Sequence, residues 1–295
     1  MTRIAVIGAG GVGAETLLEL KRASIKADIH IIDRDFVDAD TLKRQTLFQQ
    51  ADVGRLKAMA AAEKLGKKFT AISEHLSGGN ADALLQGATV VLDCTDNWAT
   101  RCVINTWALQ HQKPWIFTSA IRSQTMTTTV TSETACFVCW NPTPATPRSC
   151  RLEGIEKETT AMAAQTQTAE LVAVLAKRPR LAGKLQLTDV QSKACTIKAL
   201  SKNPECPACV KKTFHLPEQR TVTLCGDGEY LFQLDGAVDF KSFESFKPKK
   251  FGDVLKIKWK TAELVVFQSG RVLARGMTER HAKAAVDAIR QKMDS

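Results

Sequence analysis

The sequence lacks a long apolar run, contains a single tyrosine, and has no visible repeat or low-complexity segment. No stretch approaches the roughly 18 apolar residues of a membrane-spanning helix, so we expect no membrane segment. The first strand-like run starts at Arg3, and we therefore expect no signal or transit peptide. The net charge is +10, but the basic residues are scattered, so we expect an acidic protein partner or a polyphosphate rather than nucleic acid.

What is present fits an ordinary globular protein of 295 residues, since 44% of them are hydrophobic. The chain could hold one large domain or one and a half. The nine cysteines are an odd number in a chain without a recognisable secretion signal. That usage indicates a reducing compartment, and we expect a cytoplasmic protein.

Residues 3–130 alternate strand-like and helix-like runs, which predicts an α/β fold with a Rossmann-like, mostly parallel sheet and crossover helices. The expected strands are 3–8, 28–33, 69–74, 88–93, 114–120 and 125–131. The expected helices are 12–24, 54–66, 80–86 and 97–111.

The remainder of the chain predicts a crossover and a second, smaller domain. Residues 140–158 are rich in proline and charge and predict an exposed loop. A helix at 159–177 and a strand pair in 184–202 should follow it. We place one domain at 1–215 and a small C-terminal α+β domain at 220–295. The latter should have strands at 221–225, 229–234, 254–259, 263–268 and 271–275 and a helix at 278–292.

The opening stretch predicts a nucleotide site. A glycine loop, GAGGVG, follows the first strand, and glycines at a strand-to-helix turn let the backbone approach a phosphate. Asp33 ends the next strand at the interval suited to a ribose hydroxyl. Taken alone, these features fit a dinucleotide site as well as other nucleotide sites.

Two basic residues and one acid favour a triphosphate. Arg44 and Lys57 follow Asp33, and each cation would offset phosphate charge. Asp96 follows the buried strand-like run VVLD and should face the same crevice, where it could hold Mg²⁺. The alternative for Arg44 and Lys57 is that they are solvated surface cations. The alternative for Asp96 is that it caps the helix that begins near Asn97.

Four cysteines form two C-x-x-C pairs, Cys136 with Cys139 and Cys206 with Cys209. Two such pairs predict a closed, structural four-thiolate zinc site that staples distant segments; a redox dithiol or a disulfide are the alternatives. Apolar or strand-like surroundings predict buried, inert side chains for Cys94, Cys102, Cys195 and Cys225.

Cys150 has a different environment, because it lies in the predicted loop between Arg148 and Arg151. Cationic neighbours lower the pKa of a thiol and favour the thiolate. Cys150 is therefore a candidate nucleophile, with an inert loop thiol as the alternative.

Together these motifs resemble the superfamily of ubiquitin-activating enzymes and the bacterial-type ThiF, MoeB and HesA adenylyltransferases. The matching sequences are GAGGVG, IIDRD, LKRQTLF, DVGRLKA, DCTDN, the two C-x-x-C pairs, and an SC before a small-residue helix. The C-terminal sequences TLCG and LVVFQSGRVLARGM resemble the tail domain of some prokaryotic members.

The resemblance implies an ATP-dependent enzyme that adenylates the C-terminal carboxylate of a small β-grasp protein ending in Gly-Gly. It assigns Asp33 to the ribose, Arg44 and Lys57 to phosphates, and Asp96 to Mg²⁺, and makes Cys150 a candidate for a thioester or persulfide. The full set expected to bind Mg-ATP is Gly8, Gly10, Gly11, Gly13, Asp33, Asp35, Arg44, Gln45, Lys57, Asp96 and Asn97.

By the same resemblance the enzyme should be a homodimer that passes its carrier to a conjugating or sulfur-transfer protein. Three departures stand out: Thr41 replaces an asparagine, IRSQTMTTTV replaces a glycine-containing tract, and no N-terminal helices supply an arginine finger. Arg3 is the candidate substitute for that arginine. The alternative functions are an NAD-dependent oxidoreductase and a catalytically silent partner subunit.

Overall fold

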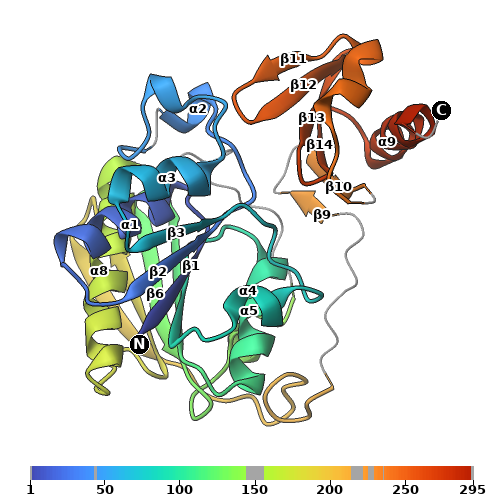
Figure 1. Ribbon diagram of the computed structural model, residues 1–295. Helices are drawn as coiled ribbons and strands as arrows, with labels where there is room; N and C mark the ends of the chain where they lie inside the picture. The colour runs from blue at the N-terminus through green and yellow to red at the C-terminus, as the bar shows by residue number, and fades with distance from the viewer. Residues whose placement is uncertain are drawn as a thin grey trace.

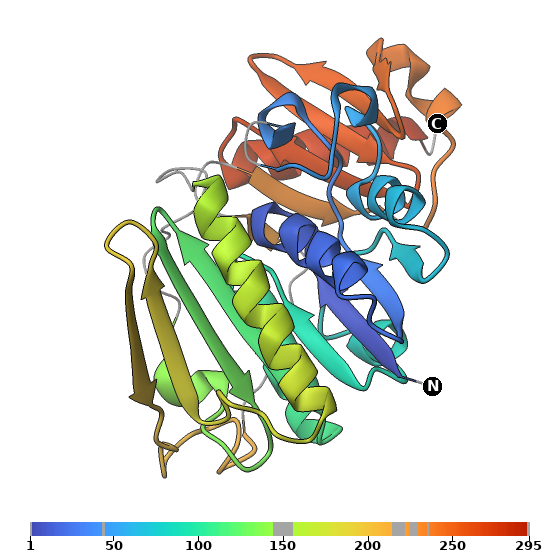
Figure 2. The same cartoon turned by 90° about the vertical axis from the view of Figure 1, so that its left-hand side faces the viewer.

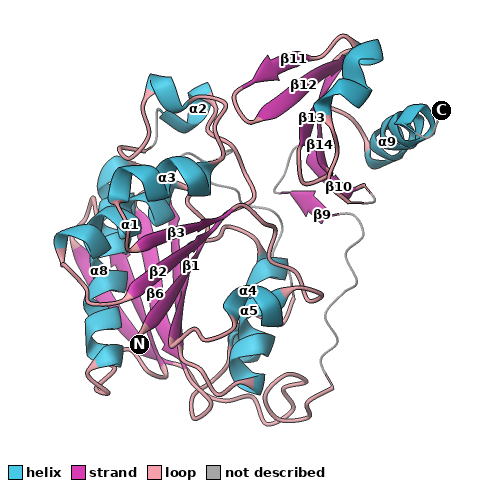
Figure 3. Ribbon diagram, viewed as in Figure 1, coloured by secondary structure: helices cyan, strands magenta, loops and turns pink. Residues whose placement is uncertain are grey.

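The computed structural model describes residues 2–42, 45–143, 156–213, 222–224, 229–234 and 236–293. These residues form a large α/β domain followed by a small domain with its own sheet (Figure 1). Figure 3 shows how the helices of the first domain lie outside its central sheet. In the described ranges, no helix is long and apolar enough to cross a bilayer.

The helices and strands of the first domain, in chain order, are β1 (Arg3–Ile7), α1 (Gly11–Arg22), β2 (Asp28–Ile32), α2 (Ala39–Leu42), the 3₁₀ turn η1 (Gln50–Asp52), α3 (Lys57–Leu65), β3 (Phe69–Ile72), α4 (Ala81–Leu85), β4 (Val90–Asp93), α5 (Trp98–Gln110), β5 (Trp115–Ile121), β6 (Gln124–Val130), α6 (Phe137–Trp140), α8 (Lys157–Leu175), β7 (Lys184–Asp189) and β8 (Ala194–Ala199). Those of the second are β9 (Val222–Leu224), β10 (Glu229–Gln233), η2 (Phe240–Phe246), β11 (Lys249–Phe251), β12 (Val254–Trp259), β13 (Ala262–Phe267), β14 (Arg271–Arg275) and α9 (Glu279–Met293).

The first sheet has eight strands in the order β3-β2-β1-β4-β5-β6-β7-β8. Strands β1 to β5 run parallel, and β6 to β8 are added antiparallel. The chain passes outward from β1 to β3 and then returns to β4 beside β1. That reversal creates a switch point between the carboxyl ends of β1 and β4, where open α/β sheets bind ligands. The mostly parallel fold with crossover helices is confirmed.

Two helical layers explain why the central strands are mostly apolar. Helices α1, α3 and α8 cover one face, and α8 lies along α1 in Figure 2. Helices α4, α5 and α6 cover the other face. Strand β4 is buried at every position, as expected for a parallel strand covered on both sides.

The elements expected from periodicity are present, and the longer helices begin and end within three residues of the expected positions. Short elements were missed: α2, α6 and β11 have three or four residues each, too few for a periodic pattern.

The second sheet has six strands, all antiparallel, in the order β11-β12-β13-β14-β10-β9. Helix α9 packs one face through alanines and branched residues, including Ala282, Val286 and Ile289. The opposite face lies against the first domain, where Phe36 packs with Val265 and Phe267.

Candidate functional site

The glycine loop joins β1 to α1 at the switch point. Gly8 has φ +92°, and a Cβ there would lie 2.9 Å from the carbonyl oxygen of Cys94. A Cβ on Gly13 would lie 2.0 Å from the oxygen of Gly8, so Gly13 is required for packing and does not line the pocket. Gly10 and Gly11 do line it, next to the first backbone N–H groups of α1. Free N–H groups at a helix start favour an anion.

Asp33 fixes this loop through its carboxylate. The backbone N–H of Ala9 donates to Oδ2 and that of Asp35 donates to Oδ1, each at 2.6 Å. Burial raises the pKa of the Asp33 carboxyl, and the Lys57 ammonium opposes that effect. Each oxygen retains a second lone-pair direction, so Asp33 can accept from a ligand hydroxyl while it holds the loop.

Lys57 and Gln45 form one wall of the pocket. Lys57 is 9% exposed and its Nζ lies 3.4 Å from Oδ2 of Asp35. Gln45 is 7% exposed, and among the residues that the structure describes its Oε1 has no hydrogen-bond partner. A buried amide oxygen without a partner is costly, which favours a ligand donor at this point. Arg44 lies outside the described residues, and so does the side chain of Thr41.

Asp96 and Asn97 lie at the carboxyl end of β4, on the other side of the glycine loop. Asp96 is exposed and lines the pocket. Asn97 caps α5, because its Oδ1 accepts from the N–H of Thr100 at 2.8 Å. The capping alternative therefore belongs to Asn97, and the Asp96 carboxylate faces the crevice.

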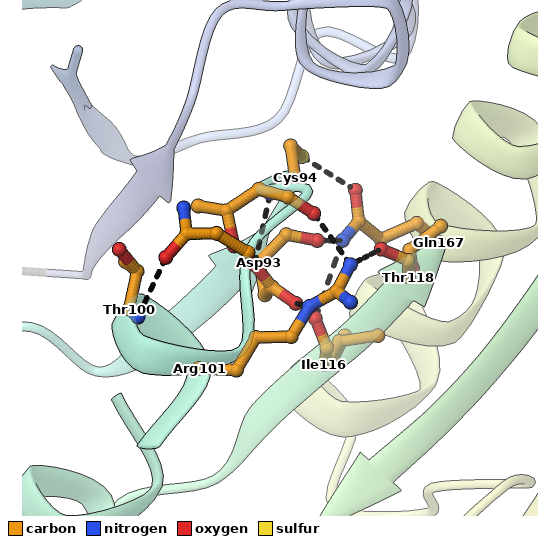
Figure 4. Close-up of polar contacts among 9 residues, drawn as sticks. Asp93, Cys94, Thr100, Arg101, Ile116, Thr118 and Gln167 are labelled. Atoms are coloured by element: carbon orange, nitrogen blue, oxygen red, sulfur yellow. Dashed lines mark hydrogen bonds and ion pairs between the residues drawn. The ribbon is translucent and has the colours of Figure 1, made fainter. Parts of the chain in front are cut away.

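A buried network supports this end of β4 (Figure 4). Asp93 is fully buried and accepts from Arg101 Nε at 3.0 Å and from the N–H and hydroxyl of Thr95. Gln167, from α8, donates to the carbonyl oxygens of Asp93 and Ile116. Burial raises the pKa of the Asp93 carboxyl and Arg101 lowers it. Arg101 also donates to the carbonyl oxygen of Thr95, so the pair fixes the residue before Asp96.

Several pocket residues were not predicted. Thr118, 1% exposed, has a hydroxyl without a partner among the described residues, and His75 accepts from Arg34 at Nδ1. Burial lowers the pKa of His75 to about 3, so the ring is neutral. Glu229 lines the pocket from the second domain. No sequence motif or spacing predicts these residues, because only the folded chain brings them together.

Arg3 lies far from the glycine loop of its own chain, at the opposite end of β1. It begins β1, at the amino end, whereas the glycine loop follows the carboxyl end. Its Nη1 donates to the carbonyl oxygen of Gln86 at 2.7 Å. Arg3 therefore cannot supply the arginine finger to the pocket of its own chain.

The two C-x-x-C pairs come together. The four sulfur atoms of Cys136, Cys139, Cys206 and Cys209 all lie within 4.8 Å of one another. The Cys136–Cys206 and Cys139–Cys209 sulfur distances are 3.6 and 3.4 Å, near the about 3.8 Å that tetrahedral Zn–S bonds impose. Burial raises the pKa of the Cys136 thiol, so a bound cation is what would keep it a thiolate. The residues fit a zinc ion.

The other cysteines differ from one another. Cys94 and Cys102 are buried, and burial raises the pKa of both thiols to about 12, as expected for inert side chains. The expectation for Cys195 was wrong: it is exposed, because β8 is an edge strand with all six residues exposed. Cys150 and Cys225 lie outside the described residues.

The pocket as a whole has a volume of about 240 Å³ and is lined from the carboxyl ends of β1, β2, β3, β4 and β5. It brings together helix N–H groups, the Lys57 cation and the exposed Asp96 carboxylate, a combination that can hold a phosphate chain with its metal ion. Fold and pocket thus define a Rossmann-like protein whose switch-point crevice suits a phosphate-bearing ligand.

The chain belongs to the ThiF family, whose profile matches residues 1–208. It is 31% identical over 216 residues to the sulfur carrier protein ThiS adenylyltransferase of Escherichia coli, covering 70% of this chain and 86% of that protein. It is 33% identical to the adenylyltransferase and sulfurtransferase MOCS3 of Anopheles gambiae, over 70% of this chain but only 49% of the relative.

Solved structures confirm the fold. The crystal structure of Escherichia coli MccB with ATP aligns with a TM-score of 0.61 at 17% identity, covering 70% of this chain and 67% of that one. At this identity the likeness bears on the fold alone.

Proposed function

We propose that this protein is an adenylyltransferase that uses Mg-ATP to activate the C-terminal carboxylate of a small sulfur-carrier or ubiquitin-like protein ending in Gly-Gly. The observation that carries the proposal is the convergence of Gly10, Gly11, Asp33, Lys57 and Asp96 on one switch-point pocket. The relationship to the ThiS adenylyltransferase, which extends over most of that enzyme, supports it.

The reaction needs no general base, because the carrier carboxylate is already a nucleophile. Its oxygen attacks the α-phosphorus, the P–O bond to the β-phosphate breaks, and pyrophosphate leaves with the electron pair. The work of the site is therefore alignment and charge neutralisation. The products are the acyl-adenylate and pyrophosphate.

Each pocket residue has a role in that chemistry. Asp33 holds the ribose, and the α1 N–H groups beside Gly10 and Gly11 hold a phosphate oxygen. Lys57, together with Arg44, neutralises charge on the phosphates. Asp96 holds the Mg²⁺ ion, which supplies further neutralisation when bound.

Further roles complete the proposal. Asp35 orients Lys57, and Asn97 fixes the start of α5. Gln45 offers the nucleotide its side-chain oxygen, which has no partner in the part of the chain that the structure describes. Cys150 accepts the activated carrier as a thioester, releasing AMP. The four cysteines hold a structural zinc ion, and the working form is a cytoplasmic homodimer. An arginine from outside the pocket's own chain, either Arg3 of a second copy or a residue of a partner, would supply the finger.

No observation favours either of the two alternative functions, an NAD-dependent oxidoreductase or a silent partner subunit. The relatives quoted above are named adenylyltransferases, which does not favour an NAD-dependent oxidoreductase. A silent partner subunit would have no need of the intact set of Asp33, Lys57 and Asp96 at the pocket.

The test is isotope exchange between ATP and pyrophosphate, with each small β-grasp protein ending in Gly-Gly from the same genome offered in turn. We expect exchange that depends on one carrier, and a loss of about 100-fold or more in Asp96→Ala. Asp82→Ala is the matched control, because Asp82 is an exposed aspartate paired with His111 on the helix layer. No exchange with any such carrier, from a folded protein, would reject the proposal.

A further inference from the structure

The second domain packs directly on the strand ends that build the pocket (Figure 1). Phe36, 2% exposed and three residues after Asp33, is surrounded by apolar side chains of the second sheet. Its ring centroid lies 6.2 Å from those of both Phe251 and Phe267. Phe36 belongs to the segment that leads from the ribose-side aspartate toward Gln45.

The other end of that segment is held by the same sheet. The N–H of Leu56 donates to Oδ2 of Asp253 at 3.0 Å, and the N–H of Asp253 donates to the carbonyl oxygen of Gly54 at 3.0 Å. A Cβ on Gly252 would lie 2.3 Å from the carbonyl carbon of Gly54, so the backbones are in contact. Residues 36–56, which carry Gln45 and end next to Lys57, are therefore fixed at both ends by the second domain.

Arg271 makes the most specific contact. It begins β14 and is 2% exposed. Nη1 donates to the carbonyl oxygen of Arg34 at 3.0 Å, and Nη2 donates to that of Ser73 at 2.8 Å. Arg34 follows Asp33, and Ser73 precedes Glu74. Asp33 and Glu74 both line the pocket. One guanidinium thus joins the carboxyl ends of β2 and β3 from outside the first domain.

The remaining Arg271 contacts hold the guanidinium in place. Nε donates to the hydroxyl of Ser269 at 3.0 Å, and the group stacks 4.6 Å above the Phe267 ring. A buried cation is costly, and an apolar residue would serve a plain docking surface at least as well. Only arginine supplies planar, fixed donors that can reach two carbonyl oxygens at once.

The same sheet also contributes to the pocket wall itself. Glu229 begins β10 and lines the pocket. Arg275 Nε lies 3.1 Å from Glu229 Oε1, and Arg275 Nη1 lies 3.8 Å from Asp38 Oδ2 in the first domain. The pocket is therefore built from both domains.

We propose that the second domain is part of the nucleotide site, with Arg271 as the positioning residue that sets the β2–β3 wall for ATP. This inference rests on the proposed function. Asp33, on this wall, is the expected ribose contact, whereas the carrier tail must approach the α-phosphate from elsewhere. Loss of Arg271 should therefore weaken ATP binding and leave the handling of the carrier unchanged.

The test uses the full chain with two variants, Arg271→Lys and Arg271→Met. We expect the Kd for Mg-ATP, measured by calorimetry without carrier, to rise about tenfold or more, which corresponds to about 1.4 kcal/mol. At saturating ATP, kcat and the KM for the carrier should stay within about twofold of the wild type. Arg290→Lys is the matched control, because Arg290 donates to the carbonyl oxygen of Gln233 within the second domain.

Hydrogen exchange provides a second readout that needs no nucleotide. Backbone amides in 33–36 and 72–76 should exchange faster in Arg271→Lys than in Arg290→Lys, while those of β1 and β4 stay unchanged. If Arg271→Met does not fold, Arg271→Lys alone decides, because it retains the charge but cannot reach both carbonyl oxygens. Wild-type ATP affinity and wild-type exchange in a folded Arg271→Lys would overturn the inference. A wild-type protein that binds ATP without activating any carrier would contradict only the proposed function.

Discussion

Three aspartates lie at the carboxyl ends of β2 and β4, and each has a different environment. Asp93 is fully buried against Arg101, Asp33 holds backbone N–H groups of the glycine loop, and Asp96 is exposed in the pocket. Burial raises the pKa of the first two, and both have donors that favour the carboxylate. Of the three, Asp96 is the exposed one, as we expect for a carboxylate that holds a partly hydrated metal ion.

At the scale of single residues, Cys150 carries the sharpest prediction. A thioester forms when the thiolate attacks the carrier adenylate and AMP leaves, so the adduct should appear with ATP and carrier and disappear on addition of excess thiol, which cleaves the thioester by exchange. We expect none in Cys150→Ala, while ATP–pyrophosphate exchange stays within about threefold of the wild type, because adenylation precedes transfer. Non-reducing electrophoresis of the reaction measures the adduct.

Cys195→Ala is the control for that experiment, because Cys195 is exposed on the β8 edge strand and lies away from the pocket lining. An adduct that persists in Cys150→Ala and is lost in Cys195→Ala would assign the thioester to the edge strand instead.

The pocket residues show where sequence reasoning reaches its limit. Gly10, Asp33 and Asp96 could be predicted because each lies next to a strand end, and Lys57 because its charge suits a phosphate. Glu229 and Arg271 could not, since they follow Asp96, the last of these residues, by more than 130 positions along the chain. Their positions depend on how the second sheet docks, which no periodic pattern or local spacing records.

Among the elements, those with a clear period were predicted and those without one were not. Strand β4 has three consecutive apolar residues before Asp93, and α8 is long and rich in alanine. Strand β11 has three residues, two of them lysines, and lacks any alternation of apolar residues. The error at Cys195 has a related cause: a strand sequence does not say whether the strand is central or at an edge.

The four-cysteine cluster joins α6 to the turn that carries Cys206 and Cys209, with 66 residues between the two pairs. We expect one zinc ion per chain, lost on chelation and in Cys206→Ser, with a decrease of about 3 kcal/mol or more in the free energy of unfolding. Metal analysis and urea denaturation measure the two effects.

Cys195→Ser should retain the metal and unfold within about 0.5 kcal/mol of the wild type, since the residue is exposed. Equal metal content in the Cys206→Ser and Cys195→Ser proteins would show that the cluster is not the zinc site.

For the whole molecule, the cluster around Phe36 couples the two domains. Phe36→Ala removes a buried ring from between the sheets, and we expect the free energy of unfolding to fall by about 3–5 kcal/mol. The wild-type protein should unfold in one calorimetric transition that includes both domains, and the variant should separate it into two.

Met59→Ala is the control, because Met59 is 49% exposed on α3 and its loss should cost less than about 0.5 kcal/mol. Two well-separated transitions already present in the wild type would show that the contact between the sheets contributes little.

The contact of Arg271 with the β2 and β3 ends also has a consequence for protein synthesis. Domains generally fold in the order in which the ribosome releases them, so the glycine loop and Asp33 emerge long before Arg271 does. A ligand stabilises only the state that contains its site. ATP would therefore stabilise the chain that has already been translated through β14 and would leave the shorter nascent chains without that support.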